Sequence, residues 1–113
     1  MNTLGAAAEA AAAEYLRRAG LAIVACNWSC RHGELDIIAR DGATLVFVEV
    51  RKRASRRFGG AAASIGAAKR AKLVASAQAY LQTLSAIPPC RFDAVCFDGN
   101  QVEWLKNCID ASC

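Results

Sequence analysis

The stretch GELDIIARDGATLVFVEVRK, residues 33–52, decides the fold of this chain. It contains two runs of β-forming residues, 33–40 and 44–52, with the dipeptide Asp41-Gly42 between them. Asp-Gly between two such runs is a strong signal for a β-hairpin. Residues 45–50 are apolar on both faces of the expected strand, so this strand should be central in a sheet that is covered on each side.

The segments around the hairpin complete an α/β pattern. Gly5 and Gly20 bracket a helical periodicity, and Pro88-Pro89 end a second one. The remaining predicted segments are strands at 21–26, 91–97 and 101–105, a loop at 54–64 and a helix at 65–84. The order α-β-β-β-α-β-β predicts one mixed α/β domain over residues 1–113.

Each predicted helix has one apolar stripe. The buried residues expected in the first helix are Leu4, Ala8, Ala12, Tyr15, Leu16 and Ala19, and those in the second are Leu73, Ala77, Tyr80, Leu81 and Leu84. Glu9 projects within about 20° of Leu16 at 100° per residue. A carboxylate at the edge of an apolar stripe suggests a role beyond solubility.

The hairpin brings acidic residues together. A two-residue turn at Asp41-Gly42 places Glu34 opposite Glu49, and Asp36 and Arg51 then share their face. Neighbouring carboxylates destabilise a sheet unless a cation compensates, and a hard divalent ion such as Mg²⁺ would do so. An ion pair between Arg51 and an acid, with Glu34 in solvent, is the structural alternative, and a three-residue turn would change the shared face.

The basic residues are concentrated in one segment. The chain has a net charge of +4, but residues 51–72 contain eight basic residues and no acidic one. The candidate nucleic-acid-binding residues are Lys52, Arg53, Arg56, Arg57, Lys69, Arg70 and Lys72. This distribution favours a polyanion partner, contacted through phosphates with weak sequence specificity, although an ordinary solvated basic face is the alternative.

Several blocks together resemble the YraN family of bacterial proteins. The matching blocks are Gly5 with Glu9, Ala12, Tyr15 and Leu16; residues 33–38; 47–53; 58–60; Lys69 with Leu73, Ala77, Tyr80 and Leu81; 91–93; and Glu103-Trp104. That family resembles the PD-(D/E)xK nucleases and, more distantly, Holliday junction resolvases. The resemblance implies a restriction-endonuclease-like fold with an αβββαβ core, in which helices flank a mixed sheet.

The resemblance also implies roles for the acidic residues. Asp36 takes the place of the first motif aspartate, with Leu35 where a proline would stand, and Glu49 takes the second acidic place. Arg51 stands where the motif has lysine, and Glu9 resembles an extra acid of the resolvase-like members. The implied catalytic residues are thus Asp36, Glu49, Arg51 and Glu9, and the implied ligands of Mg²⁺ or Mn²⁺ are Asp36, Glu49 and Glu34.

These residues predict a metal-dependent endonuclease acting on DNA, with branched or recombination intermediates as candidate substrates. Arg51 cannot act as a base, because arginine stays protonated, and Lys52 points to the opposite strand face. A non-catalytic nucleic-acid-binding module of the same fold and a basic protein-interaction domain are therefore the alternatives. Junction resolution would require two active sites and hence a homodimer.

The remaining features predict packing and location. No apolar run is long enough for a membrane span, and no secretory signal is apparent, so we expect a cytoplasmic protein. The six cysteines form no CxxC pair and are read as small apolar residues. We expect His32 in a turn, Trp28 and Trp104 in packing, and Asp93 in a structural role.

Overall fold

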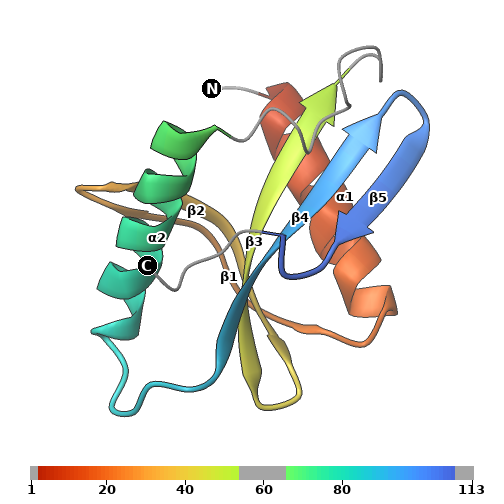
Figure 1. Cartoon of the computed structure of the whole chain (residues 1–113). Coiled ribbons are helices and arrows are strands. Elements are labelled where there is room, and N and C mark those ends of the chain that lie inside the picture. The colour runs from red at the N-terminus through yellow and green to blue at the C-terminus, as the bar shows by residue number, and fades with distance from the viewer. Residues whose placement is uncertain (1–2, 54–65, 109–113) are drawn as a thin grey trace.

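The computed structural model describes residues 3–53 and 66–108, which form two helices and five strands (Figure 1). In chain order these are α1 (Thr3–Arg18), β1 (Ala22–Cys30), β2 (Gly33–Asp41), β3 (Thr44–Arg53), α2 (Ala67–Leu81), β4 (Cys90–Asp98) and β5 (Gln101–Leu105). This confirms the predicted α/β order. It is compatible with the αβββαβ core of the restriction-endonuclease-like fold, to which β5 is added.

The strands form one mixed sheet in the order β1-β2-β3-β4-β5. β1 with β2, β2 with β3, and β4 with β5 are antiparallel, whereas β3 and β4 are parallel. β3 is therefore central, as its apolar faces predict. The parallel pair needs a crossover connection, and α2 lies in that connection.

The two helices cover opposite faces of the sheet (Figure 1). On one face Ala12 and Leu16 of α1 pack against Ile37, Val48 and Val95. On the other face the cluster includes Leu35, Ile38, Phe47, Leu73, Ala77 and Phe92. Burial on both faces explains why β3 is apolar at successive positions. Neither helix is long and apolar enough to cross a membrane within the described ranges.

The stripe predicted for α1 is partly wrong. Ala12 and Leu16 are buried, but Tyr15 is 36% exposed and Ala19 lies beyond the helix end in an exposed turn. Ala13 is buried in their place, because the face of α1 that meets the sheet is centred closer to Ala13 than the predicted stripe is. Tyr15 instead packs edge-on against Trp104 of β5. The side chain of Leu4 lies outside the described residues.

The second helix is shorter than the predicted 65–84. Residue 65 lies outside the described part, and α2 ends at Leu81. Leu73 and Ala77 are buried as expected, whereas Tyr80, Leu81 and Leu84 are partly buried against the same cluster. Leu84 reaches that cluster from the turn after the helix.

The hairpin turn lies one residue later than predicted. Asp41 pairs with Thr44, so the turn residues are Gly42 and Ala43. Gly42 has φ 62°, and two-residue hairpin turns require a positive φ at their first position. The register therefore differs by two residues from the predicted one, which leaves the face of each side chain unchanged along the paired residues 37–48.

The first strand is longer than the predicted 21–26. β1 continues to Cys30, because Trp28, Ser29 and Cys30 pair with the start of β2. Asn27 lies within the strand at φ 55°. His32 lies in the turn between β1 and β2, as expected. Trp28 packs edge-on against Tyr80 of α2.

Candidate functional site

The candidate site lies where β2 and β3 separate. Their ladder runs from the turn to the pair Ile37–Val48. Beyond this pair, the backbone N–H of Val50 donates a hydrogen bond to Oδ2 of Asp36 over 2.9 Å. A side chain thus takes the place of a strand carbonyl as the acceptor. The gap between the two strands is therefore occupied by the carboxylate of Asp36.

Acidic residues from three elements converge on Asp36. One carboxylate oxygen from each of Glu9, Glu34 and Asp36 lies within 4.8 Å of the other two. Glu9 comes from α1, as the sequence predicts, and its carboxylate is hydrogen-bonded by the side chain of Asn27. Asp36 also has a side-chain hydrogen-bonding contact with Glu49. The four predicted acids therefore belong to one cluster.

The arrangement of this cluster differs from the predicted single hairpin face. The observed turn means that Glu34 is not opposite Glu49, and its carboxylate instead lies with Glu9 and Asp36. Glu49 points toward α2, where it meets Lys69. Asp36 links the Glu9 side of the cluster to the Glu49 side, because it lies between the separated strands.

Burial and like charge hold protons on this cluster. Desolvation, followed by the charge and hydrogen bond of Glu49, raises the pKa of Asp36 to about 8. The N–H of Val50 opposes this shift because it favours the ionised form. Desolvation and the charge of Glu34 also raise the pKa of Glu9, against hydrogen bonds from Asn27 and Asp36.

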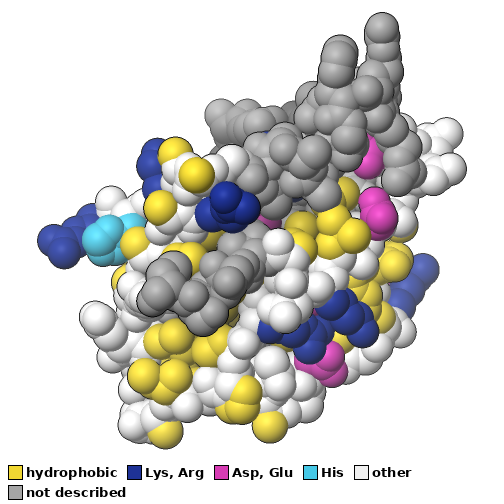
Figure 2. Space-filling view, viewed as in Figure 1, with side chains coloured by type: hydrophobic (Ala, Val, Ile, Leu, Met, Phe, Trp, Pro, Cys, Tyr) yellow, Lys and Arg dark blue, Asp and Glu magenta, His cyan; other side chains and the backbone are white. Residues whose placement is uncertain are grey.

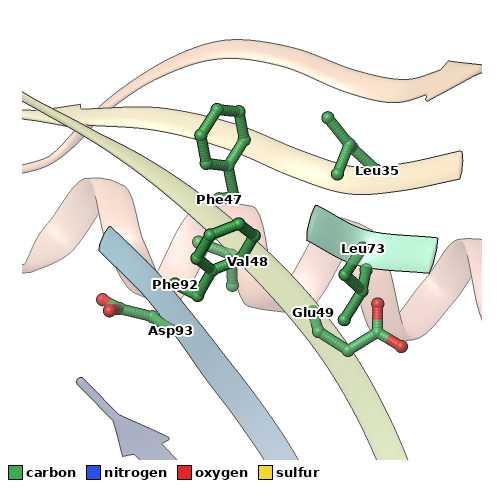
Figure 3. A pocket seen from close by; sticks show the side chains of 7 residues that line it. All are labelled: Leu35, Phe47, Val48, Glu49, Leu73, Phe92 and Asp93. Atoms are coloured by element: carbon green, nitrogen blue, oxygen red, sulfur yellow. The ribbon is translucent and has the colours of Figure 1, made fainter. Parts of the chain in front are cut away.

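Glu49 is buried, and only one of its two carboxylate oxygens contacts a positively charged group in the described part of the chain. It is 3% exposed, and its Oε2 lies 3.4 Å from Nη1 of Arg51 and 3.2 Å from Nζ of Lys69. With Asp36 ionised, Oε1 of Glu49 has no hydrogen-bond partner among the described residues. A hydrogen bond between Asp36 and Glu49 requires the proton that Asp36 retains. Figure 3 shows the Glu49 side chain beside Leu73 and the Asp93 carboxylate pointing away from it. A buried carboxylate oxygen without a donor is costly unless a ligand satisfies it.

This donor set suits a hard divalent cation. Mg²⁺ and Mn²⁺ prefer carboxylate oxygens and water, and they relieve the repulsion that keeps a proton on Asp36. Asp36 and Glu49 could hold such an ion directly, with Glu9 and Glu34 beside it. The free oxygen of Glu49 is the observation that supports the fit, since clustered surface acids by themselves would not.

The predicted basic residues lie on two elements. Lys69, Arg70 and Lys72 are exposed on the first half of α2, and Lys52 is exposed on β3. The side chain of Arg53, and all of Arg56 and Arg57, lie outside the described residues. Only Lys69 among the basic residues of α2 forms an ion pair with the acid cluster in the described part of the chain.

Sequence reasoning did not single out Arg31, although it extends the basic surface. Arg31 and His32 are exposed in the β1–β2 turn, and Nε of Arg31 donates to Nε2 of His32 over 3.4 Å. A Cβ at Gly33, which follows them, would lie 4.0 Å from Cβ of Lys72. Figure 2 shows basic side chains and the histidine together at this edge. Lys72 of α2 therefore lies beside this turn. We call the exposed basic residues of the turn and of the helix after Lys69 the basic edge, namely Arg31, His32, Arg70 and Lys72.

Asp93 has the structural role that the sequence predicts. It is fully buried, and it accepts hydrogen bonds from Nε of Arg91 at 3.0 Å, Nε1 of Trp104 at 2.9 Å and the backbone N–H of Asn107 at 2.8 Å. Arg91 also forms an ion pair with Asp41, in which Nη2 of Arg91 lies 3.0 Å from Oδ2 of Asp41. This network ties β4 to β5 and to the hairpin turn, away from the acid cluster.

Comparison with known proteins confirms the resemblance to a family. The model of "Uncharacterised protein family UPF0102" matches residues 8–97. The chain belongs to this family, whose other name is the YraN family. A UPF0102 protein of Janthinobacterium sp. is 51% identical over 95% of this chain and 87% of its own length. A UPF0102 protein of Cupriavidus taiwanensis is 52% identical over 95% of this chain and 82% of its own length.

A third UPF0102 protein aligns with this chain over the whole of its own length. The relative from Methylobacillus flagellatus is 48% identical over 98% of this chain and 100% of its own. The family model matches residues 8–97, and this range includes Glu9, Glu34, Asp36 and Glu49 as well as the basic residues of α2.

Two neighbours of the acids in this UPF0102 chain were not predicted as such. Asn27 reaches Glu9 because its positive φ turns β1 locally, and asparagine tolerates that conformation better than most residues. The sequence predicts that Lys69 binds phosphate, whereas in the structure its ammonium group pairs with Glu49. Both contacts join residues far apart in the sequence, so periodicity could not reveal them.

Proposed function

We propose that this protein is a divalent-metal-dependent endonuclease that acts on DNA. The observation that carries the proposal is Glu49, a buried carboxylate with one oxygen paired to two cations and the other without a donor in the described structure. A group of this kind is stable when a ligand completes it, and the surrounding acids select a cation.

The acids and the cations would have different tasks. Asp36 and Glu49 would hold Mg²⁺ or Mn²⁺, supported by Glu9 and Glu34. A metal ion bound there would polarise the scissile phosphate and lower the pKa of a bound water. Arg51 would stabilise negative charge on the phosphate, since its guanidinium remains protonated and lies next to Glu49.

The basic edge supports DNA as the substrate. Arg31, Arg70 and Lys72 are exposed on the β1–β2 turn and on α2, the helix whose Lys69 pairs with Glu49. The acid cluster would repel a polyanion on its own. A bound cation removes that repulsion, and the basic edge then attracts the phosphates on either side of the site. Contacts of this kind position a duplex without reading its bases, so we propose weak sequence specificity. Branched DNA remains a candidate substrate within this proposal, and we propose that the protein acts in the cytoplasm.

Arg51 supports one alternative function, a nucleic-acid-binding module without cleavage. Arginine cannot exchange a proton with the attacking water, so a chain with arginine at this point could bind DNA and leave it intact. Both functions predict DNA binding that weakens steeply with salt, whereas a protein-interaction domain does not. Only the nuclease predicts cleavage that depends on Glu49 and on a metal ion.

The test is a cleavage assay with matched acidic variants. Wild type, Glu49→Gln and Glu14→Gln are incubated with linear duplex, single-stranded and four-way-junction DNA, with Mg²⁺, Mn²⁺ or EDTA. Glu14 is exposed and pairs with Arg17 and Arg18 at the far end of α1, so it controls for loss of one charge. We expect metal-dependent cleavage by wild type and by Glu14→Gln, and none by Glu49→Gln.

Two results would contradict the nuclease. One is cleavage that Glu49→Gln retains, which would identify a contaminating enzyme. The other is the absence of cleavage on all three substrates with either metal, combined with salt-dependent DNA binding. That second result would establish the binding module instead.

A further inference from the structure

Lys69 connects the basic helix to the acid cluster. It is the third residue of α2, and its Nζ lies 3.2 Å from Oε2 of Glu49 on the face of the sheet that α2 covers. The side chain of Lys69 is 44% exposed, whereas that of Glu49 is 3% exposed. The ammonium group therefore stands between a buried carboxylate and the solvent, where a DNA phosphate would arrive.

The stability of the helix does not account for this lysine. α2 begins at Ala67 after Gly66, which makes no side-chain cap hydrogen bond, and the first turn has no acidic residue. A cation in the first turn opposes the helix dipole. The partner that offsets this cost is Glu49, so the position of Lys69 is explained by the site and not by α2.

Arg51 and Lys69 contact the same oxygen but present different donors. The Arg51 guanidinium is planar and reaches Glu49 from β3, two residues along the same strand. The Lys69 ammonium is a compact charge with three donors, one of which is directed at Glu49. The other two donors can reach a water molecule and a phosphate oxygen at the solvent side of the site.

We infer that Lys69 is a catalytic residue of this site, whose ammonium holds the attacking water against Glu49 and stabilises the charge of the phosphate. The inference rests on the proposed function. Lys69 acts through its positive charge and its hydrogen-bond geometry. The attacking water gives its proton to solvent, its oxygen bonds to phosphorus, and the bond from phosphorus to the leaving sugar oxygen breaks. Its neighbours Arg70 and Lys72 contribute to DNA affinity and not to the reaction itself.

The test compares lysine variants in the full chain. Lys69→Met removes the ammonium and keeps the length of the side chain, whereas Lys69→Arg keeps the charge. Lys106→Met is the charge-matched control, because Lys106 lies after β5 over the ring of Trp104. Lys72→Met serves as the comparison for DNA affinity. The measurements are the cleavage rate at saturating DNA, DNA affinity in EDTA and Mn²⁺ affinity by calorimetry.

We expect Lys69→Met to lower the saturating rate by about 100-fold, as the loss of one charge-stabilising donor does in other enzymes. Lys69→Arg should recover part of this rate because the charge remains. Lys69→Met should also bind Mn²⁺ about three- to tenfold more tightly, because a cation next to a ligand oxygen has been removed. Lys72→Met should reduce DNA affinity more than the saturating rate, and Lys106→Met should resemble wild type in all three measurements.

The possible failures are distinguishable. If wild type cleaves DNA and Lys69→Met cleaves it at the rate of Lys106→Met, the inference is wrong and the proposed function stands. If wild type cleaves nothing, the proposed function is wrong. In that case equal Mn²⁺ affinity in Lys69→Met and Lys106→Met would also overturn the placement of Lys69 at the metal site.

Discussion

Val50 and Asp36 are joined by a hydrogen bond in which the backbone N–H of Val50 donates to Oδ2 of Asp36 over 2.9 Å. This contact marks the point where β2 leaves β3, since the ladder between them ends at Ile37 and Val48. It also holds the Asp36 carboxylate among Glu9, Glu34 and Glu49. The same separation of strands that weakens the sheet therefore builds the acid cluster.

Asp36→Asn should stabilise the protein increasingly as pH rises. Burial and Glu49 raise the pKa of Asp36 to about 8 in the folded chain. A raised carboxyl pKa favours folding below the pKa of the unfolded chain, about 3.9, and this contribution is lost as pH rises toward 8. Asparagine lacks this titration and can still accept the bond from Val50. In metal-free urea unfolding we expect equal stability near pH 4, and a gain of about 1–3 kcal/mol near pH 8. A loss of stability at high pH would contradict this.

Metal affinity should increase with pH over the same range. A divalent ion must displace the proton that Asp36 retains, so binding is linked to proton release. Titration calorimetry should show Mn²⁺ affinity rising by up to about tenfold per pH unit between about pH 6 and 8. Glu49→Gln should weaken Mn²⁺ binding at least about tenfold, because it removes a ligand charge. Affinity that is independent of pH would place the ion away from Asp36.

The basic edge should determine the salt dependence of DNA binding. The triple variant Arg31→Gln, Arg70→Gln, Lys72→Gln removes three exposed charges from the β1–β2 turn and α2. Each lost phosphate contact should reduce the slope of log affinity against log salt by about 1, so we expect a reduction of about 2–3. Fluorescence anisotropy measures the slope. The matched control carries Arg17→Gln, Arg18→Gln and Lys106→Gln, and an equal reduction there would indicate a general charge effect.

Arg51→Lys should not increase cleavage. Lys69 already provides an ammonium group at Oε2 of Glu49, so a second one adds no new chemistry. Lysine would also lose the planar guanidinium that contacts Glu49 from β3. We expect a saturating cleavage rate equal to that of wild type or reduced by up to about tenfold. A clear gain in rate would show that Arg51 itself limits the reaction.

Asp93 and Glu49 should respond differently to loss of charge. Asp93 is fully buried with donors from Arg91, Trp104 and Asn107, so Asp93→Asn should destabilise the fold by about 3 kcal/mol or more. Glu49→Gln removes repulsion with Asp36 but loses ion pairs, so its stability should remain within about 1 kcal/mol of wild type. Urea unfolding measures both, and equal large losses would make Glu49 a structural residue.

The sequence determined the order of elements and the identity of the acids. The apolar residues of β3 showed that it is central, because a strand buried on both faces requires such a composition. The hairpin was predicted with its turn one residue early, since Asp-Gly and Gly-Ala turns are both compatible with the local pattern. That error preserved the face of each residue in the paired part of the hairpin, whereas the contact between Asp36 and Glu49 depends on the separation of β2 from β3 beyond Ile37 and Val48.

Only the tertiary structure decided how the site is completed. Asn27 reaches Glu9 through a local backbone turn, and Lys69 reaches Glu49 from a helix that follows in the chain. Periodicity describes which face a residue occupies within its own element. It contains no information on the distance between elements, which depends on how α1 and α2 pack on the sheet and on where β2 separates from β3. The acids could therefore be identified from sequence, whereas their protonation, their cations and the free oxygen of Glu49 follow from packing.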